Sequence, residues 1–177
     1  MVPSVLKISI DGQHIDERSP GAILQNVEIR QELNQHWWCE IVCRQTEDRR
    51  FPIEECLGKD LRLEASDENQ VTYVLFDGLV LEAELEYEIY GSYTARILGV
   101  TRSYKLDLTP RQKFYPTTSI VDIGQALTGQ AGLSFSHQVE VKDTPKFYLQ
   151  YGETDFAFLN RLADDHGCWL RPAPDGI

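Results

Sequence analysis

The sequence predicts a mainly β protein with two short helices (α+β), in which an antiparallel barrel or sandwich precedes the helices. Strand-like segments recur about every ten residues through roughly the first hundred positions, a spacing typical of antiparallel sheets rather than of βαβ units. Several of these segments alternate apolar with acidic residues, as expected for strands with one buried and one solvated face. Beyond residue 116 the apolar residues take up a helical spacing in two places.

Two Asp-Gly dipeptides are the strongest turn signals among the expected strands. Asp11–Gly12 follows the apolar run 5–10, and Asp77–Gly78 follows the run 71–76. Asp-Gly is favoured in two-residue hairpin turns because both central positions need a positive φ. We therefore expect a tight turn at each dipeptide.

Residues 117–133 form the first expected helix, and the run 134–141 after it reads as a strand. Ser119 is a suitable N-cap, and Asp122 lies near the positive end of the helix dipole. Gly132 suits the left-handed position at the C-terminal end. The two glycines inside the helix cost about 1 kcal/mol each relative to alanine, so packing must stabilise it. Its apolar face consists of Ile120, Ile123, Leu127 and Ala131.

The second expected helix lies near the C-terminus. The extended aromatic run 147–151 precedes it, and Thr154 or Glu153 begins it, with acidic residues at its positive end. Gly167 is the expected stop, and 168–171 then reads as the beginning of a new strand. The apolar stripe of this helix consists of Phe156, Leu159, Leu162 and Ala163, widened by Phe158.

Charge and hydropathy exclude several classes of function. The net charge is −11, and the densest basic group, Arg44 with Arg49 and Arg50, is interrupted by acidic residues. We therefore expect no nucleic-acid partner. No apolar run approaches the roughly 20 residues that span a bilayer, so no membrane insertion by this segment is expected. Residues 1–7 are too short and polar for a signal peptide, which places synthesis in the cytoplasm.

The sequence carries no recognisable catalytic, metal-binding or cofactor-binding motif. Cys39 and Cys43 lie four positions apart on a strand-like run, about 13 Å from each other, which is too far for one zinc ion. The adjacent residues 164–166, Asp-Asp-His, point in different directions on a helix and do not form a ligand set. Carboxylate pairs for glycoside hydrolysis show no identifying spacing. We expect no catalytic residue, no metal and no cofactor.

A more specific pattern occupies residues 150–167, QYGETDFAFLNRLADDHG. A glutamine-tyrosine strand end leads into Glu-Thr-Asp, then Phe-x-Phe-Leu-x-Arg-Leu, two acidic residues and a glycine. This segment resembles the signature of VgrG and phage late-control tail hub proteins. Residues 118–123 with 132–133 resemble the preceding helix of the same proteins, and residues 77–80 and 93–108 resemble a turn and a strand of their long hairpin. The residues that carry the signature are Gln150, Tyr151, Glu153, Asp155, Phe156, Phe158, Leu159, Arg161, Leu162 and Gly167.

The resemblance implies a domain organisation and a role for each motif residue. Residues 1–115 would form an antiparallel β-barrel hub domain and 116–146 a connector that contains the first helix. Residues 147–177 would hold the motif helix and the start of a second, truncated barrel, ending in an unpaired apolar strand. The apolar residues of the motif would pack the helix on the barrel, Asp155 would cap it and Gly167 would end it.

The resemblance also implies a mechanical, non-enzymatic function. The protein would be the hub or spike base of a contractile injection apparatus, forming a homotrimer in its full-length form. Its other partners would be a hexameric inner-tube protein and the baseplate and spike-tip components. It would be assembled in the apparatus or the virion and could be exported by it. A phage tail, a type VI secretion system and an extracellular injector all remain open.

The alternative is a β-sandwich ligand-binding module for carbohydrate or peptide. Such a module needs an exposed aromatic platform, and Trp37–Trp38 is the candidate. Adjacent residues of a strand face opposite ways, so one of the two tryptophans is expected in the core. An enzyme is a weaker alternative, because toxin domains of the resembling family lie beyond a needle that this sequence does not contain.

Overall fold

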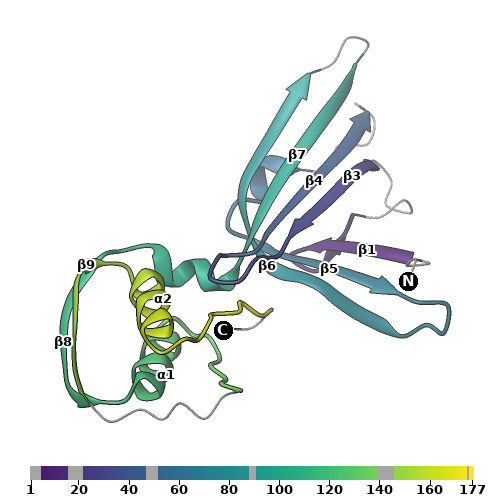
Figure 1. The fold of residues 1–177 in the computed structure, drawn as a ribbon. Helices are drawn as coiled ribbons and strands as arrows, with labels where there is room; N and C mark the ends of the chain where they lie inside the picture. The colour runs from purple at the N-terminus through teal and green to yellow at the C-terminus, as the bar shows by residue number, and fades with distance from the viewer. Residues whose placement is uncertain (1–4, 16–21, 47–51, 88–90, 139–145, 175) are drawn as a thin grey trace. The chain divides into compact units, whose positions relative to one another are not determined.

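The computed structural model describes residues 5–15, 22–46, 52–87, 91–138, 146–174 and 176–177 of the chain (Figure 1). It divides into two compact units. Unit 1 comprises Met1–Gln31 and Trp37–Thr101, and unit 2 comprises Glu32–His36 and Arg102–Ile177. The division differs from the expected boundary at residue 115, because the strand that contains Tyr115 pairs within unit 2.

Unit 1 is an antiparallel sheet of seven strands in the order β2-β1-β5-β6-β7-β4-β3. Within the described segments the outer strands β2 and β3 do not pair with each other, so the sheet is a curled half-barrel. The predicted mainly β fold with two short helices is confirmed, although the described strands form a half-barrel and not a closed barrel. The elements of unit 1 are β1 (Val5–Ile10), β2 (Gln13–His14), β3 (Ala22–Arg30), β4 (Trp38–Thr46), the 3₁₀ turn η1 (Ile53–Glu55), β5 (Asp60–Ser66), β6 (Thr72–Tyr87) and β7 (Ser92–Thr101).

The core of unit 1 follows from the alternation along its strands. Cys39, Ile41 and Cys43 on β4 are at most 1% exposed, while the residues between them face the other side of the sheet. Leu61 and Leu63 on β5 show the same pattern. Each buried aliphatic side chain contributes about 1.5–3 kcal/mol, so this face holds the sheet together.

The turn predicted at Asp11–Gly12 is confirmed. It joins β1 to β2, and its two residues have φ angles of 50° and 79°, as a two-residue hairpin turn of the primed type requires. Local sequence alone decides such a turn, because the positive φ angles suit Asp and Gly and few other residues.

The turn predicted at Asp77–Gly78 is wrong, because both residues lie inside the 16-residue strand β6. Its first half pairs with β5, down to Asp60↔Leu79, and its second half pairs with β7, from Gly78↔Thr101 onward. The strand therefore changes partners at Gly78 instead of reversing. A Cβ at Gly78 would lie 2.1 Å from the carbonyl oxygen of Val100, so glycine is needed here for close approach of two backbones.

Unit 2 combines a two-stranded antiparallel sheet with two helices. Its core is separate from that of unit 1 and includes Leu106, Tyr115, Ile123, Leu127 and Phe158. No helix among the described residues is long and apolar enough to cross a bilayer. The elements are the 3₁₀ helix η2 (Arg102–Asp107), β8 (Arg111–Thr118), α1 (Ile120–Gln130), β9 (Lys146–Glu153) and α2 (Asp155–Asp165).

The two helices begin and end in the same way. Ser119 and Thr154 are the N-caps, and each side chain accepts a hydrogen bond from the backbone N–H three residues later. Each C-terminus forms a Schellman motif around a glycine with positive φ, Gly132 or Gly167. In α2 the N–H of Cys168 donates to the carbonyl of Ala163 at 2.8 Å, and α1 shows the equivalent bond. The predicted ends of both helices are therefore confirmed.

Two predicted strands are absent. Residues 134–138 contain only an isolated bridge, Ser134↔Gly176, and residues 139–141 of that prediction lie outside the described residues. Residues 168–171 do not form a strand either. The C-terminal residue is not unpaired: the N–H of Ile177 donates to Ser134 at 3.2 Å, and its carbonyl accepts from Ser136 at 3.0 Å. Ile177 is 7% exposed and belongs to the core of unit 2.

We predict that Gly78→Ala destabilises unit 1 by about 1–3 kcal/mol, because the added methyl group forces β6 away from β7. The same change at Gly129 in α1, where an added methyl group would meet nothing within 4 Å, should stabilise by about 1 kcal/mol. Urea unfolding monitored by circular dichroism measures both. Equal effects at the two positions would contradict the role assigned to Gly78.

Candidate functional site

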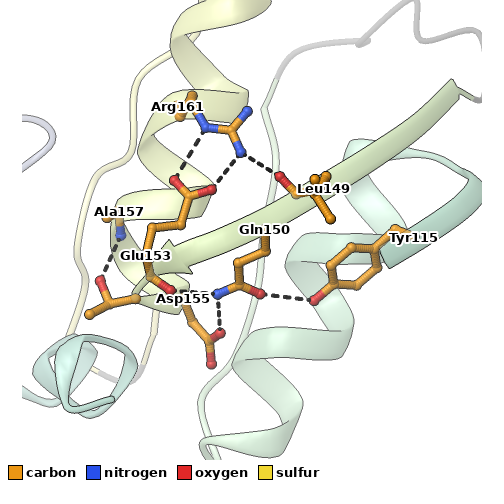
Figure 2. A network of polar contacts seen from close by, with 8 residues as sticks. Tyr115, Leu149, Gln150, Glu153, Asp155, Ala157 and Arg161 are labelled. Carbon is orange, nitrogen blue, oxygen red and sulfur yellow. Dashed lines mark hydrogen bonds and ion pairs between the residues drawn. The ribbon is translucent and has the colours of Figure 1, made fainter. Parts of the chain in front are cut away.

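The segment 150–167 that the sequence singled out forms the end of β9, the whole of α2 and the turn that ends it. Its polar side chains make one connected network with β8 and with the start of α2 (Figure 2). The geometry of this network decides whether the motif carries chemistry or holds the fold together.

Gln150 lies at the centre of the network and is 0% exposed. Its amide nitrogen donates to Asp155 Oδ1 at 2.9 Å and to the carbonyl oxygen of Glu153 at 3.1 Å. Its amide oxygen faces the hydroxyl of Tyr115 on β8, 3.5 Å away. The side chain thereby joins β9, β8 and the first turn of α2, and it gives the Asp155 carboxylate and the Glu153 carbonyl a hydrogen-bond donor.

The resemblance implied that Asp155 caps the motif helix, but Asp155 is not the N-cap residue. The N-cap is Thr154, whose hydroxyl accepts from the N–H of Ala157 at 3.2 Å. Asp155 is the first helical residue, is 4% exposed and lies 3.4 Å from Arg111 Nε. Its carboxylate therefore receives both a guanidinium and the Gln150 amide, which stabilises a buried charge at the positive end of the helix.

Arg161 connects the middle of α2 to β9 through an ion pair and a hydrogen bond. Its guanidinium lies 2.5 Å from Glu153 Oε1 and donates to the carbonyl oxygen of Leu149 at 2.9 Å. The same group lies 5.1 Å from the centre of the Phe158 ring. A planar fork with several donors suits this arrangement, which a lysine would not reproduce.

The apolar residues of the motif pack within unit 2. Phe156, Phe158, Leu159 and Leu162 are at most 5% exposed and belong to the core of unit 2. Phe158 stacks on Tyr115 of β8 with ring centres 5.5 Å apart. Tyr151, by contrast, faces solvent and is 72% exposed.

A segment that the sequence did not single out, Glu32–His36 between β3 and β4, completes this site. Asn34 has a positive φ of 61°. Its backbone N–H donates to the carbonyl oxygen of Leu170 at 2.9 Å, and its side-chain Oδ1 accepts from the N–H of Leu170 at 2.7 Å. Its carbonyl oxygen accepts from Asn160 of α2 at 3.1 Å. Asn160 and Leu170 lie 126 and 136 residues from Asn34 in the sequence, so no local sequence pattern predicts these contacts.

His36 is buried beside the motif helix, with its ring 3.8 Å from that of Phe156. Its Nδ1 lies 2.9 Å from Ser103 Oγ, and its Nε2 lies 3.4 Å from Asp107 Oδ2. The hydroxyl of Thr154, the cap of α2, donates to the same Asp107 carboxylate. Burial lowers the pKa of His36, and this effect exceeds the opposing influence of Asp107.

These residues make a Ser-His-Asp set, but its geometry does not suit catalysis. Ser103 is 0% exposed, so no substrate reaches its hydroxyl. A nucleophile also needs a space beside it for the reacting atom, and this one is enclosed by the packed η2 and α2. The set fixes the segment Glu32–His36 against the start of α2.

The remaining reactive groups are also held in structural environments. Cys39, Cys43 and Cys56 are buried as free thiols, and burial raises the pKa of Cys39 to about 12 and that of Cys56 to about 11. They stay protonated at neutral pH and are weak nucleophiles and ligands. Among the described residues no group of three or more His, Cys, Asp or Glu side chains is arranged to hold a metal ion.

As predicted, one of the two adjacent tryptophans is in the core and the other is on the opposite face of the sheet. Trp37 is 8% exposed and belongs to the core of unit 1, whereas Trp38 is only half-buried and lines a surface hollow.

A family model described as the phage tail baseplate hub (GPD) matches residues 30–174. The match includes most of both units and the whole of the 150–167 motif. No curated protein matches the sequence.

Three solved structures share the fold at low sequence identity. A 43 kDa tail protein of the MuSo2 prophage from Shewanella oneidensis covers 92% of the chain with a TM-score of 0.69 and 13% identity. A type VI secretion component from E. coli, described as similar in structure to T4 bacteriophage tail proteins, covers 89% with a TM-score of 0.63 and 18% identity. A tail protein from Neisseria meningitidis covers 97% with a TM-score of 0.64 and 13% identity. The chain spans 48%, 43% and 48% of the lengths of these structures, respectively.

We predict that Gln150→Leu destabilises unit 2 by about 1–3 kcal/mol, because Asp155 and the Glu153 carbonyl lose a buried donor. Gln112→Leu on the neighbouring strand, where the side chain is exposed, is the matched control and should change stability by less than about 0.5 kcal/mol. Thermal and urea unfolding measure the difference. An equal effect of the two changes would show that the Gln150 network does not hold the motif.

We predict that unit 2 loses stability as the pH falls below about 6.5, the value for an unfolded histidine, because His36 is harder to protonate when folded than when unfolded. Above pH about 6.5 both states hold a neutral ring and the full stability is present. Below it the unfolded state takes up a proton first, and the slope approaches about 1.4 kcal/mol per pH unit until the folded ring titrates.

The variant His36→Gln should flatten this part of the pH profile, while His137→Gln, with an exposed side chain, should leave it unchanged. Urea unfolding at a series of pH values provides the measurement. An unchanged slope in His36→Gln would assign the acid sensitivity to other groups.

Proposed function

The chain belongs to the phage tail baseplate hub family, and on this premise we propose that it is a structural, non-enzymatic hub component of a contractile injection apparatus. The observation that carries the proposal is the family match over residues 30–174. The fold shared with phage tail proteins and with a type VI secretion component agrees with it.

The arrangement of the motif supports a mechanical role. Gln150, Asp155 and Arg161 each bind another part of unit 2. Their polar groups hold β8, β9 and α2 in one geometry. Such a network suits a component that must keep its shape while neighbouring parts of a machine bear on it.

The proposed partners are those of a hub. The full-length protein would form a homotrimer, dock the hexameric inner tube on one side and connect to the baseplate and spike-tip components on the other. It would reside in the assembled apparatus or virion. Because the similar structures come from phage tails and from a type VI secretion system, the proposal covers both kinds of machine.

We expect loss of the gene to prevent assembly of the tail or secretion tube, and re-expression of the full-length protein to restore it. Electron microscopy of sheared cells or lysates counts the assembled tubes. Re-expression of Phe158→Ala, which opens a cavity in the core of unit 2, should restore assembly poorly, whereas Tyr151→Ala at an exposed site of the same motif should leave the fold intact. Normal tube numbers without the gene would refute the proposed function.

A purified full-length protein that stays monomeric and does not bind the inner-tube protein would also count against the hub. Light scattering gives the number of copies, and co-purification with the tube protein gives the partner.

A further inference from the structure

The two-stranded sheet β8–β9 of unit 2 has one face toward α2 and one face away from it. Tyr115 on β8 stacks on Phe158 of α2, and Gln150 on β9 donates to Asp155 of the same helix. Figure 1 shows both helices on this side of the two strands. Successive residues of a strand face opposite ways, so the residues that alternate with these lie on the other face. We call it the outer face, and its described members are Gln112 and Phe114 of β8 and Phe147, Leu149 and Tyr151 of β9.

The outer face is mostly apolar and exposed. Phe147 is 75% exposed, Tyr151 is 72%, Phe114 is 57% and Leu149 is 51%. The register places Phe114 directly opposite Leu149, and the ring centres of Phe114 and Phe147 are 6.2 Å apart. These side chains therefore form one continuous patch. Monomeric proteins rarely expose an apolar patch of more than a few hundred Å², and larger patches mark interaction sites.

The size of the patch matches what a contact between two copies needs. An aromatic side chain has about 200 Å² to bury, so the three exposed rings offer roughly 400 Å², to which Leu149 adds. A stable homodimer buries about 800 Å² per partner, of which about two thirds is apolar. The outer face thus supplies most of the apolar area that such a contact requires.

Charge also favours a second copy of this chain on the outer face. The net charge is −11, so two copies repel each other over most of their surfaces. None of the five described residues of the outer face is charged, so two copies can meet there without bringing like charges together. In a twofold contact each surface meets itself, which suits an uncharged aromatic surface and not a charged one.

We propose that the outer face of β8–β9 binds the same face of a second copy of this chain. Leu149 lies midway between Phe147 and Tyr151 on β9, so a twofold axis at Leu149 places Phe147 of each copy on Tyr151 of the other. Two sheets packed in this way lie about 10 Å apart, with their side chains interdigitated. The Tyr151 hydroxyls then lie at the rim of the contact, where they stay in water. The proposal does not rest on the hub function, and a twofold contact does not replace the threefold contacts of the proposed homotrimer.

The test measures the mass of the 177-residue chain by sedimentation velocity at protein concentrations from about 1 to about 100 μM. The chain should form reversible dimers in this range. Leu149→Asp should raise the dissociation constant by about 100-fold or more, because it places two carboxylates near the axis. Leu108→Asp is the matched control, because Leu108 is a 63% exposed leucine outside the outer face, and this variant should dimerise like the wild type.

Phe147→Asp tests the same contact at a second position and should weaken dimerisation by about tenfold or more. Circular dichroism, at a concentration where the wild type is monomeric, confirms that each variant is folded before the masses are compared. Salt provides an independent readout. Screening of the repulsion between two acidic chains should strengthen an apolar contact, whereas a contact made by ion pairs would weaken.

Three results would overturn the proposal. One is a wild-type chain that stays monomeric throughout the concentration range, and another is dimerisation that folded Leu149→Asp and Phe147→Asp leave unchanged. The third is a monomer that binds the inner-tube protein and loses this binding in Leu149→Asp, which would assign the outer face to that partner. Tube counts after loss of the gene test the hub function separately. A monomeric chain with absent tubes therefore refutes only the dimer, and a dimer with normal tubes refutes only the hub.

Discussion

The buried amide of Gln150 is the interaction on which unit 2 depends most. A two-stranded sheet such as β8–β9 is at best marginally stable in water, so it must be held by packing against other elements. Gln150 fixes the register of β9 relative to Tyr115 and, through Asp155, the direction in which α2 leaves the strand. Arg161 repeats the attachment one turn and a half later on the helix, at the Leu149 carbonyl. The apolar stripe of α2 then has one orientation in which it covers the core.

A second constraint comes from the segment Glu32–His36, which belongs to unit 2 although it lies between two strands of unit 1. The chain passes from one unit to the other after Gln31, His36 and Thr101. Unit 2 is therefore not a continuous piece of sequence, and a fragment that began at Arg102 would lack the partners of Leu170, Asn160 and Phe156. The dependence on a distant segment means that the two units are not separated by a single break in the sequence.

The motif also shows how a cluster of polar residues is distinguished from an active site. Ser103, His36 and Asp107 have the residue types and the spacing of a hydrolytic set, yet Ser103 has no exposed surface. Two acidic residues of the motif, Glu153 and Asp155, are likewise paired with Arg161 and Arg111. Accessibility, rather than composition, distinguishes this buried Ser-His-Asp set from a catalytic one.

The sequence by itself determined the features that near neighbours control. The Asp11–Gly12 turn, the Ser119 and Thr154 caps and the Gly132 and Gly167 stops are settled within four or five residues, where φ preferences and local hydrogen bonds dominate. The 150–167 pattern likewise located the motif and its family. Only the tertiary structure decided that β6 runs straight through Asp77–Gly78, because the reason is a backbone on β7 that approaches it there. It also decided that α2 packs within unit 2, that Asn34 and His36 complete the site and that Ile177 is bonded to Ser134, since each of these contacts joins residues that are distant along the chain.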